Sequence, residues 1–289
     1  MVPTQAVARY RLSALFTVFL GVLLPGLLWA NLPENHLELG LSPNQISFLV
    51  QGDEASPETV LFLHGVGSRK ETWNSVVRAL GPIGRSRRLV SMDSRGHGQT
   101  PLNGVDQRPW LHAVDLKNWM DAQGLQTAHF VGHSLGGRVA LAFAALFPER
   151  VKSLVVVDIA PFKSRRDEAS AESIRAGTLS MELAEDMIAQ SWGEDLTGSI
   201  SSAPFPILFM SGNTELGAIL TPKHQSRLLE INPQLKFSHF QNAGHGLYKE
   251  QCERFVAEIE EFWGQLPQPR PLPWYLRCSR DRKSTRLNS

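Results

Sequence analysis

The chain has 289 residues, of which 42% are hydrophobic and 20% are charged, and this composition excludes a fibrous or wholly disordered protein. Its formal net charge of +1 gives no reason to expect a nucleic-acid partner. The two cysteines, Cys252 and Cys278, are too few for a disulfide framework, and neither has the spacing of a metal site. The length suits one large α/β domain.

The first 30 residues differ from the rest of the chain. Arg9 and Arg11 precede an uncharged stretch over residues 12–30, which is typical of a secretory signal peptide. Pro25 would interrupt a continuous helix, so we place a membrane anchor second and an organelle presequence third. We therefore expect residues 1–30 to lie outside the fold. This segment predicts that the protein enters the secretory pathway or is anchored to a membrane through residues 12–30. The alternative location is the mitochondrion or another organelle.

Between residues 31 and 264, short apolar runs alternate with amphipathic stretches, which predicts an α/β domain with a mostly parallel sheet. Runs rich in β-branched and aromatic residues predict strands covered on both faces, at 59–63, 88–92, 128–131, 151–158, 206–210 and 235–240. Residues 46–50 are expected to add an antiparallel strand at the start. Helices are predicted at 71–80, 110–123, 137–147, 222–231 and 249–263.

Two segments depart from this alternation. Residues 161–203 have helical composition, no strand-like run and a length too great for a plain loop, so they predict a helical insertion over one edge of the sheet. Residues 265–289 begin with a proline-rich stretch and predict an unstructured tail. The last nine, 281–289, are typical of a translated sequencing adapter. The alternative is a solvated basic tail, and neither interpretation gives them a function.

The segment 132–136, Gly-His-Ser-Leu-Gly, lies between a predicted strand and a predicted helix. In that context a G-x-S-x-G pattern predicts a tight turn, whose strained backbone lifts the serine hydroxyl above the sheet. Ser134 is therefore the candidate nucleophile. The alternative is an ordinary turn of small residues, which the strand before it and the helix after it disfavour.

A serine hydroxyl needs a base that takes its proton, and His245 is the candidate. It follows the last predicted strand and precedes the last helix, which places it at the same sheet edge as Ser134. A loop histidine is more often a surface residue, but a serine followed later in the chain by a histidine is the order that this architecture uses. His97 stands between two glycines and is interpreted as part of a structural turn.

Two backbone N–H groups are predicted to form an oxyanion hole. One belongs to Leu135, which follows the nucleophile, and the other to Val66, which follows the first buried strand. Gly65 and Gly67 would let this backbone approach a substrate. A phosphate-binding loop is the rival interpretation, but Lys70 stands where a third glycine belongs and no G-K-[ST] follows.

Four motifs occur in order along the chain: HGVGS at 64–68, DSRGHGQT at 93–100, GHSLGG at 132–137 and AGHG at 243–246. Together they resemble the α/β-hydrolase superfamily over about residues 45–264. The resemblance implies a sheet of about eight strands, helices on both faces and a short helical lid, here 161–203. The segments VDIAP at 157–161 and SGNT at 211–214 are similar to a branch of small esterases and thioesterases, which includes YbfF-like esterases and the alpha/beta hydrolase domain-containing protein 11 group.

The resemblance also implies a carboxylate that orients His245. The usual superfamily position is a few residues past the strand at 206–210, where this sequence has Glu215 instead of an aspartate. In the resembled branch the acid can instead end the preceding strand, where Asp158 stands. We prefer Asp158 as the acid and keep Glu215 as the alternative.

The predicted function is a serine hydrolase that cleaves carboxylic esters or thioesters through an acyl-serine intermediate. The expected partner is a small-molecule ester or acyl substrate; no cofactor is implied, and the sequence has no HExxH or paired-cysteine metal site. Acyl transfer and C–C bond hydrolysis would use the same residues, and a ligand-binding receptor is the alternative from another class. Dehalogenase and epoxide hydrolase chemistry is disfavoured because it needs a carboxylate where Ser134 stands.

Overall fold

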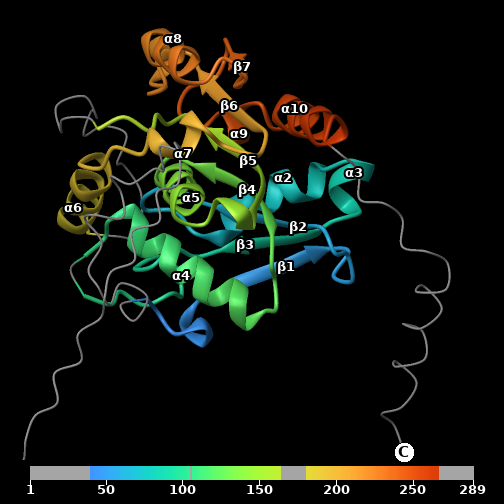
Figure 1. Ribbon diagram of the computed structural model, residues 1–289, viewed down its shortest axis with the longest axis vertical. Coiled ribbons are helices and arrows are strands. Elements are labelled where there is room, and N and C mark those ends of the chain that lie inside the picture. The colour runs from blue at the N-terminus through green and yellow to red at the C-terminus, as the bar shows by residue number, and fades with distance from the viewer. Residues whose placement is uncertain (1–39, 105, 164–179, 267–289) are drawn as a thin grey trace, which may run out of the picture.

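The computed structural model describes residues 40–104, 106–163 and 180–266, and seven strands of this part form one sheet (Figure 1). The strands are β1 (Phe48–Gly52), β2 (Thr59–Leu63), β3 (Arg88–Met92), β4 (Ala128–His133), β5 (Val151–Val157), β6 (Ile207–Gly212) and β7 (Lys236–Phe240). Their spatial order is β1-β3-β2-β4-β5-β6-β7, with β1 antiparallel to β3 and all other pairs parallel. The predicted α/β fold with a mostly parallel sheet is therefore confirmed.

The strand count differs from the expected number of about eight. In the described part of the chain before β1, residues 43–45 form a 3₁₀ turn and no strand.

Nine α-helices are present among the described residues: α2 (Asn74–Ala79), α3 (Pro82–Arg85), α4 (Pro109–Ala122), α5 (Leu135–Leu146), α6 (Met181–Trp192), α7 (Gly198–Ser201), α8 (Pro222–Ile231), α9 (Leu247–Glu250) and α10 (Cys252–Gly264). The helix predicted at 249–263 is divided, because Gln251 leaves the helical region with φ −131° and ψ 55°. The insertion predicted at 161–203 lies partly outside the described residues, and its described part contains α6 and α7.

Both faces of the sheet are apolar and covered by helices. On β2, Val60 and Phe62 join the hydrophobic cluster under α2 and α10, while Leu61 and Leu63 join the cluster under α4 and α5 (Figure 1). Successive side chains of a strand point to opposite faces, so a strand covered on both faces is hydrophobic without interruption. This double burial explains why the strands could be recognised as continuous apolar runs.

The parallel strands bring chemically active residues to one edge of the sheet. His64 follows β2, Asp93 follows β3, Ser134 follows β4 and Asp158 follows β5, while His245 lies between β7 and α9. All of them stand at or after the carboxyl end of a strand. In open α/β sheets this edge is where ligands bind.

A buried ion pair fixes the segment that follows β3. The guanidinium of Arg95 donates to both carboxylate oxygens of Asp115 on α4, at 2.9 and 2.8 Å, and the Leu41 N–H donates to the same carboxylate at 2.6 Å. Burial raises the pKa of the Asp115 carboxyl, so its ionised form depends on these donors. The pair therefore joins the β3 loop to the body of the domain.

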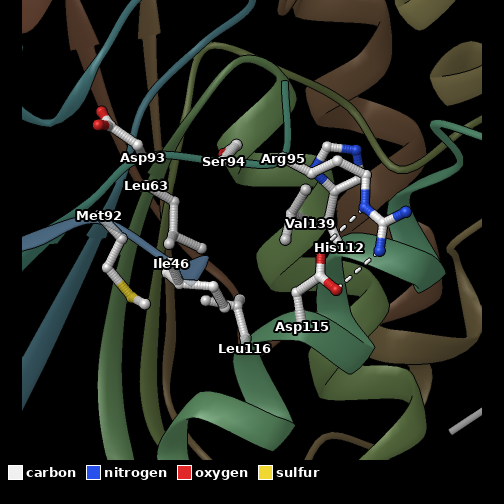
Figure 2. A pocket seen from close by; sticks show the side chains of 10 residues that line it. All are labelled: Ile46, Leu63, Met92, Asp93, Ser94, Arg95, His112, Asp115, Leu116 and Val139. Carbon is white, nitrogen blue, oxygen red and sulfur yellow. Dashed lines mark hydrogen bonds and ion pairs between the residues drawn. The ribbon is translucent and has the colours of Figure 1, made fainter. Parts of the chain in front are cut away.

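This ion pair lies in the wall of a small cavity beside His112, as Figure 2 shows. Neither ring nitrogen of His112 has a hydrogen-bond partner among the described residues, and burial holds the pKa of this histidine well below its ordinary value. The cavity volume of about 20 Å³ suits a single water molecule and is far too small for an ester.

We predict that Arg95→Met destabilises the fold strongly, because the substitution leaves the Asp115 carboxylate buried and unpaired. The expected loss is about 3–5 kcal/mol in the free energy of unfolding, measured by urea denaturation. Lys117→Met is the matched control, because Lys117 pairs with Asp121 on the same helix at the surface. This control should cost less than about 1 kcal/mol. Equal losses in the two variants would contradict the prediction.

Candidate active site

Ser134 occupies a tight turn between β4 and α5. Its backbone has φ 52° and ψ −117°, a strained conformation for any residue other than glycine. The two flanking glycines are required by close backbone contacts. A Cβ atom on Gly132 would lie 2.4 Å from the carbonyl oxygen of Gly136, and one on Gly136 would lie 2.3 Å from that of Leu63. The G-x-S-x-G segment thus folds into the turn that its sequence predicts.

Asp158 lies directly after β5, and its carboxylate is fully buried beside His245. The Nδ1 atom of His245 is 2.7 Å from Asp158 Oδ2. Backbone N–H groups of Ile219, Leu220 and Gly212 donate to the same carboxylate at 2.9, 3.2 and 3.4 Å. These backbone donors hold the carboxylate in one orientation toward the imidazole.

Glu215, the alternative acid, lies elsewhere. It is exposed within a 3₁₀ turn, Thr214–Leu216, whose backbone is bonded to the Asn213 side chain. In the described part of the chain its carboxylate makes no hydrogen bond or ion pair. The structure therefore brings Asp158 to His245 and leaves Glu215 at the surface.

His133 connects the nucleophile turn to the loop that carries His245. Its Nε2 atom donates to the carbonyl oxygen of His245 at 2.8 Å, and the two rings lie 4.5 Å apart. Burial lowers the pKa of His133 well below its ordinary value, so this ring is neutral and its Nε2 carries the proton. His133 has no signal in the sequence, because it occupies a variable position of the G-x-S-x-G pattern.

The loop that follows β2, residues 64–67 (the β2 loop), lies against the nucleophile turn. A Cβ atom on Gly65 would be 3.1 Å from the Cβ of Ser134. Val66 is the next residue of this loop, and Leu135 is the first residue of α5, where N–H groups have no partner within the helix. Neither of these two N–H groups donates to another described residue.

Two buried histidines hold the β2 loop to the loop after β3, residues 93–100 (the β3 loop). His64 accepts the Ser94 N–H at Nε2, 3.1 Å away, and donates from Nδ1 to the carbonyl oxygen of Gly65 at 2.8 Å. His97 accepts the Gly67 N–H at Nε2, also at 3.1 Å. Each bond to an N–H requires an unprotonated nitrogen, so both rings must be neutral.

The environment of these rings favours the neutral form. Burial lowers the pKa of His64 to about 3, with the neighbouring His97 as a smaller cause. Burial also lowers the pKa of His97. His97 is thus part of the loop structure, in line with its interpretation as a turn residue. Its bond to the Gly67 N–H also holds the backbone next to Val66.

Lys70, which argued against a phosphate-binding loop, is buried in an ion pair. Its Nζ atom is 2.7 Å from Asp93 Oδ2, and its backbone N–H donates to Asp93 Oδ1 at 2.7 Å. The Gln99 N–H also donates to this carboxylate, at 3.0 Å. Lys70 therefore serves to join the β2 and β3 loops.

Residues 40–104, 106–163 and 180–266 contain no group of three His, Cys, Asp or Glu side chains arranged to hold a metal ion. None of the helices in this part of the chain has both the length and the hydropathy needed to cross a membrane. The apolar segment 12–30 lies outside these residues.

The alpha/beta hydrolase fold family matches residues 58–172 of this chain. The chain is 26% identical over 270 residues to sn-1-specific diacylglycerol lipase ABHD11 of Mus musculus, a match that covers 77% of this chain and 86% of the lipase.

Two more matches extend the comparison. The chain is 36% identical over 113 residues to the 2-hydroxy-6-oxo-6-phenylhexa-2,4-dienoate hydrolase of Comamonas testosteroni, which covers 38% of this chain and 40% of that enzyme. The structure of a thermophilic esterase from Thermogutta terrifontis matches with a TM-score of 0.62 and 21% identity, over 75% of this chain and 92% of the esterase. Together with the sheet topology and the turn at Ser134, these matches show that the chain has the alpha/beta hydrolase fold.

Proposed function

We propose that this protein is a serine hydrolase that cleaves carboxylic esters or thioesters through an acyl-serine intermediate. The observation that carries the proposal is the hydrogen bond between His245 and the buried Asp158, at the sheet edge where Ser134 stands in its strained turn. The lipase and the esterase among the relatives support the same class of reaction.

In this proposal Ser134 Oγ attacks the acyl carbonyl carbon while His245 Nε2 takes the hydroxyl proton. The Asp158 carboxylate accepts a hydrogen bond from the N–H of His245 Nδ1, which leaves Nε2 unprotonated to act as the base and stabilises the imidazolium that forms. The N–H groups of Val66 and Leu135 donate to the developing oxyanion. Neither N–H is bonded to another described residue, which supports this role.

The tetrahedral intermediate collapses to the acyl-serine when His245 returns the proton to the leaving alcohol or thiol. Water then attacks the acyl-serine, and His245 takes one of its protons and passes it to Ser134 Oγ. The products are the free acid and the regenerated serine. No step of this cycle needs a metal or an organic cofactor.

C–C bond hydrolysis is a second candidate, because one relative is a hydrolase of a 2-hydroxy-6-oxo-dienoate and is 36% identical over 113 residues. That match covers less than half of either chain, whereas the match to the diacylglycerol lipase covers most of both. We therefore favour ester cleavage. Acyl transfer would be recognised because the rate depends on an acyl acceptor. A binding role on the same fold would be recognised by ligand binding without turnover.

For the N-terminal segment we propose a targeting or anchoring role. The basic residues Arg9 and Arg11 before the apolar stretch 12–30 support it. A secretory or membrane-anchored location follows from this proposal, with an organelle as the alternative.

Ser134→Ala should abolish acyl-enzyme formation and lower kcat for a p-nitrophenyl ester by at least about 10³-fold, because no hydroxyl remains to attack. Labelling by a fluorophosphonate probe, followed by peptide mapping, measures the first effect. Ser153→Ala is the control, since Ser153 is buried within β5 away from the carboxyl ends. Unchanged turnover by the Ser134 variant would refute the assignment of the nucleophile.

Asp158→Asn should reduce kcat on the order of 10⁴-fold if the site follows the serine-protease pattern, because an amide in place of the carboxylate favours the wrong tautomer of His245. Glu215→Gln is the control, and we expect less than about a threefold change from this exposed position. Both variants are assayed on one ester. If Glu215→Gln loses its activity while Asp158→Asn keeps it, the acid is Glu215, at the usual superfamily position, and the prediction is wrong.

Stability should fall as the pH is lowered from about 6.5 to about 3, because unfolded His64 takes up a proton near the upper value and folded His64 only near the lower one. His64→Gln should therefore reduce the slope of unfolding free energy against pH by up to about 1.4 kcal/mol per unit in this window. Urea denaturation at several pH values measures the slope. His239→Gln, at an exposed site, is the control. Identical slopes in His64→Gln and wild type would contradict the neutral-histidine interpretation.

A further inference from the structure

Arg138 is a buried arginine one turn after Ser134 on α5. Its backbone N–H donates to the carbonyl oxygen of Ser134 at 3.1 Å, and only 1% of the residue is exposed. Its guanidinium makes no ion pair with a carboxylate in the described part of the chain. A buried charge of this kind is costly unless hydrogen bonds compensate it.

The guanidinium donates instead to four backbone carbonyls in two separate segments. Nη1 donates to the carbonyl oxygens of Ala160 and Phe162, at 2.7 and 3.2 Å, just after Asp158. Nε donates to that of Ser191 at 2.9 Å, and Nη2 donates to that of Glu194. One side chain thus fastens the chain as it leaves the sheet and again at the end of α6.

The location of these carbonyls explains why a cation is tolerated here. Ser191 lies in the last turn of α6, and Glu194 lies just beyond its end, where the helix dipole is negative. Burial lowers the pKa of Arg138 to about 10, so it remains charged at neutral pH. Its planar fork of donors also suits two groups of acceptors in a way that the single ammonium of a lysine does not.

Helix α6, which Arg138 holds, lies against the β3 loop. A Cβ atom on Gly96 would be 3.0 Å from the Cε atom of Met187 on α6. The side chain of Gln190, also on α6, accepts the N–H of Gln107 at 2.6 Å. The same β3 loop is bonded through His97 to the β2 loop. Helix α6 therefore lies at the carboxyl edge of the sheet, next to the loops that surround Ser134.

We propose that Arg138 is a positioning residue that holds α6 as the wall against which the acyl chain of the substrate packs. Two apolar side chains of α6, Ala184 and Met187, are buried, so the apolar face of this helix is turned toward the domain. The inference rests on the proposed ester hydrolase function and adds to it the part of the molecule that selects acyl-chain length. Arg138 is one turn from Ser134, but it acts on α6 and takes no part in the chemistry.

The test compares Arg138→Lys and Arg138→Met with wild type on p-nitrophenyl acetate and p-nitrophenyl octanoate. The ratio of kcat/KM for octanoate to that for acetate should fall at least about tenfold in both variants, because α6 loses charge-assisted hydrogen bonds. A merely structural role would lower both values equally and leave this ratio unchanged, which would overturn the proposal.

Arg150→Met is the matched control. Arg150 also donates to backbone carbonyls, those of Gln126 and Leu125, but it lies just before the amino end of β5, at the opposite edge of the sheet. The Arg150→Met variant should be less stable than wild type, but its ratio of kcat/KM for octanoate to that for acetate should stay within about twofold of wild type. An equal loss of selectivity in the Arg150 variant would overturn the proposal.

A second measurement does not depend on activity. Amide hydrogen exchange of residues 183–192 in α6 should be at least about tenfold faster in Arg138→Lys than in wild type, with β4 and β5 unchanged. Unchanged exchange in α6 would overturn the inference even if the enzyme is an esterase. If wild type hydrolyses no ester and takes no fluorophosphonate label, the proposed function fails, and faster exchange would still support the role of Arg138 in holding α6.

Discussion

The hydrogen bond between Asp158 and His245 is the interaction on which the arrangement of the site depends. A fully buried carboxylate must be satisfied by donors, and Asp158 receives them from the ends of three structural segments. Gly212 ends β6, Ile219 and Leu220 belong to the segment before α8, and His245 belongs to the loop before α9. Satisfying one carboxylate therefore brings the chain after β5, β6 and β7 together at one point.

Neutral histidines continue this network on the other side of Ser134. His133 donates to the loop that holds His245, while His64 and His97 join the β2 and β3 loops through backbone groups. A neutral imidazole offers one donor and one acceptor in a rigid ring, so it can bridge two backbone segments without introducing a charge. Burial maintains this state by disfavouring protonation. The neutral histidines thus hold these loops without adding charge, beside the Lys70–Asp93 ion pair that also joins the β2 and β3 loops.

The sequence predicted those parts of the fold and site that depend on local pattern or chain order. The strands were recognisable because both faces of the sheet are buried, and Ser134 was recognisable because its turn tolerates only glycine at two neighbouring positions. The preference for Asp158 over Glu215 came from a family resemblance, since both residues follow strands. It is the buried contact with His245 that distinguishes them in the structure.

The site residues that the sequence did not predict make hydrogen bonds to residues far away along the chain. His133 contacts a residue 112 positions away, and Arg138 contacts carbonyls 22 to 56 positions away. Backbone carbonyls have no sequence signature, so no local pattern could identify them as the partners of a buried arginine.

Backbone strain is concentrated at two residues of the site. Ser134 and Asp158 are the only non-glycine residues with positive φ in the described part of the chain, at 52° and 48°. Each conformation costs on the order of 1–3 kcal/mol and persists only where its surroundings impose it. Here the surroundings are the sheet itself. The Ser134 N–H donates to Val157, and the Asp158 N–H donates to Met210, so the parallel ladder extends one residue beyond β4 and β5.

The strained pair is therefore held by the most rigid part of the molecule, the centre of a sheet that is buried on both faces. Helix α6 has no such ladder, and its C-terminal end depends on the guanidinium of Arg138. In the proposed ester hydrolase, the sheet would hold the backbone of Ser134 and Asp158 for bond cleavage, while α6, attached through the side chain of Arg138, would form the wall for the acyl chain.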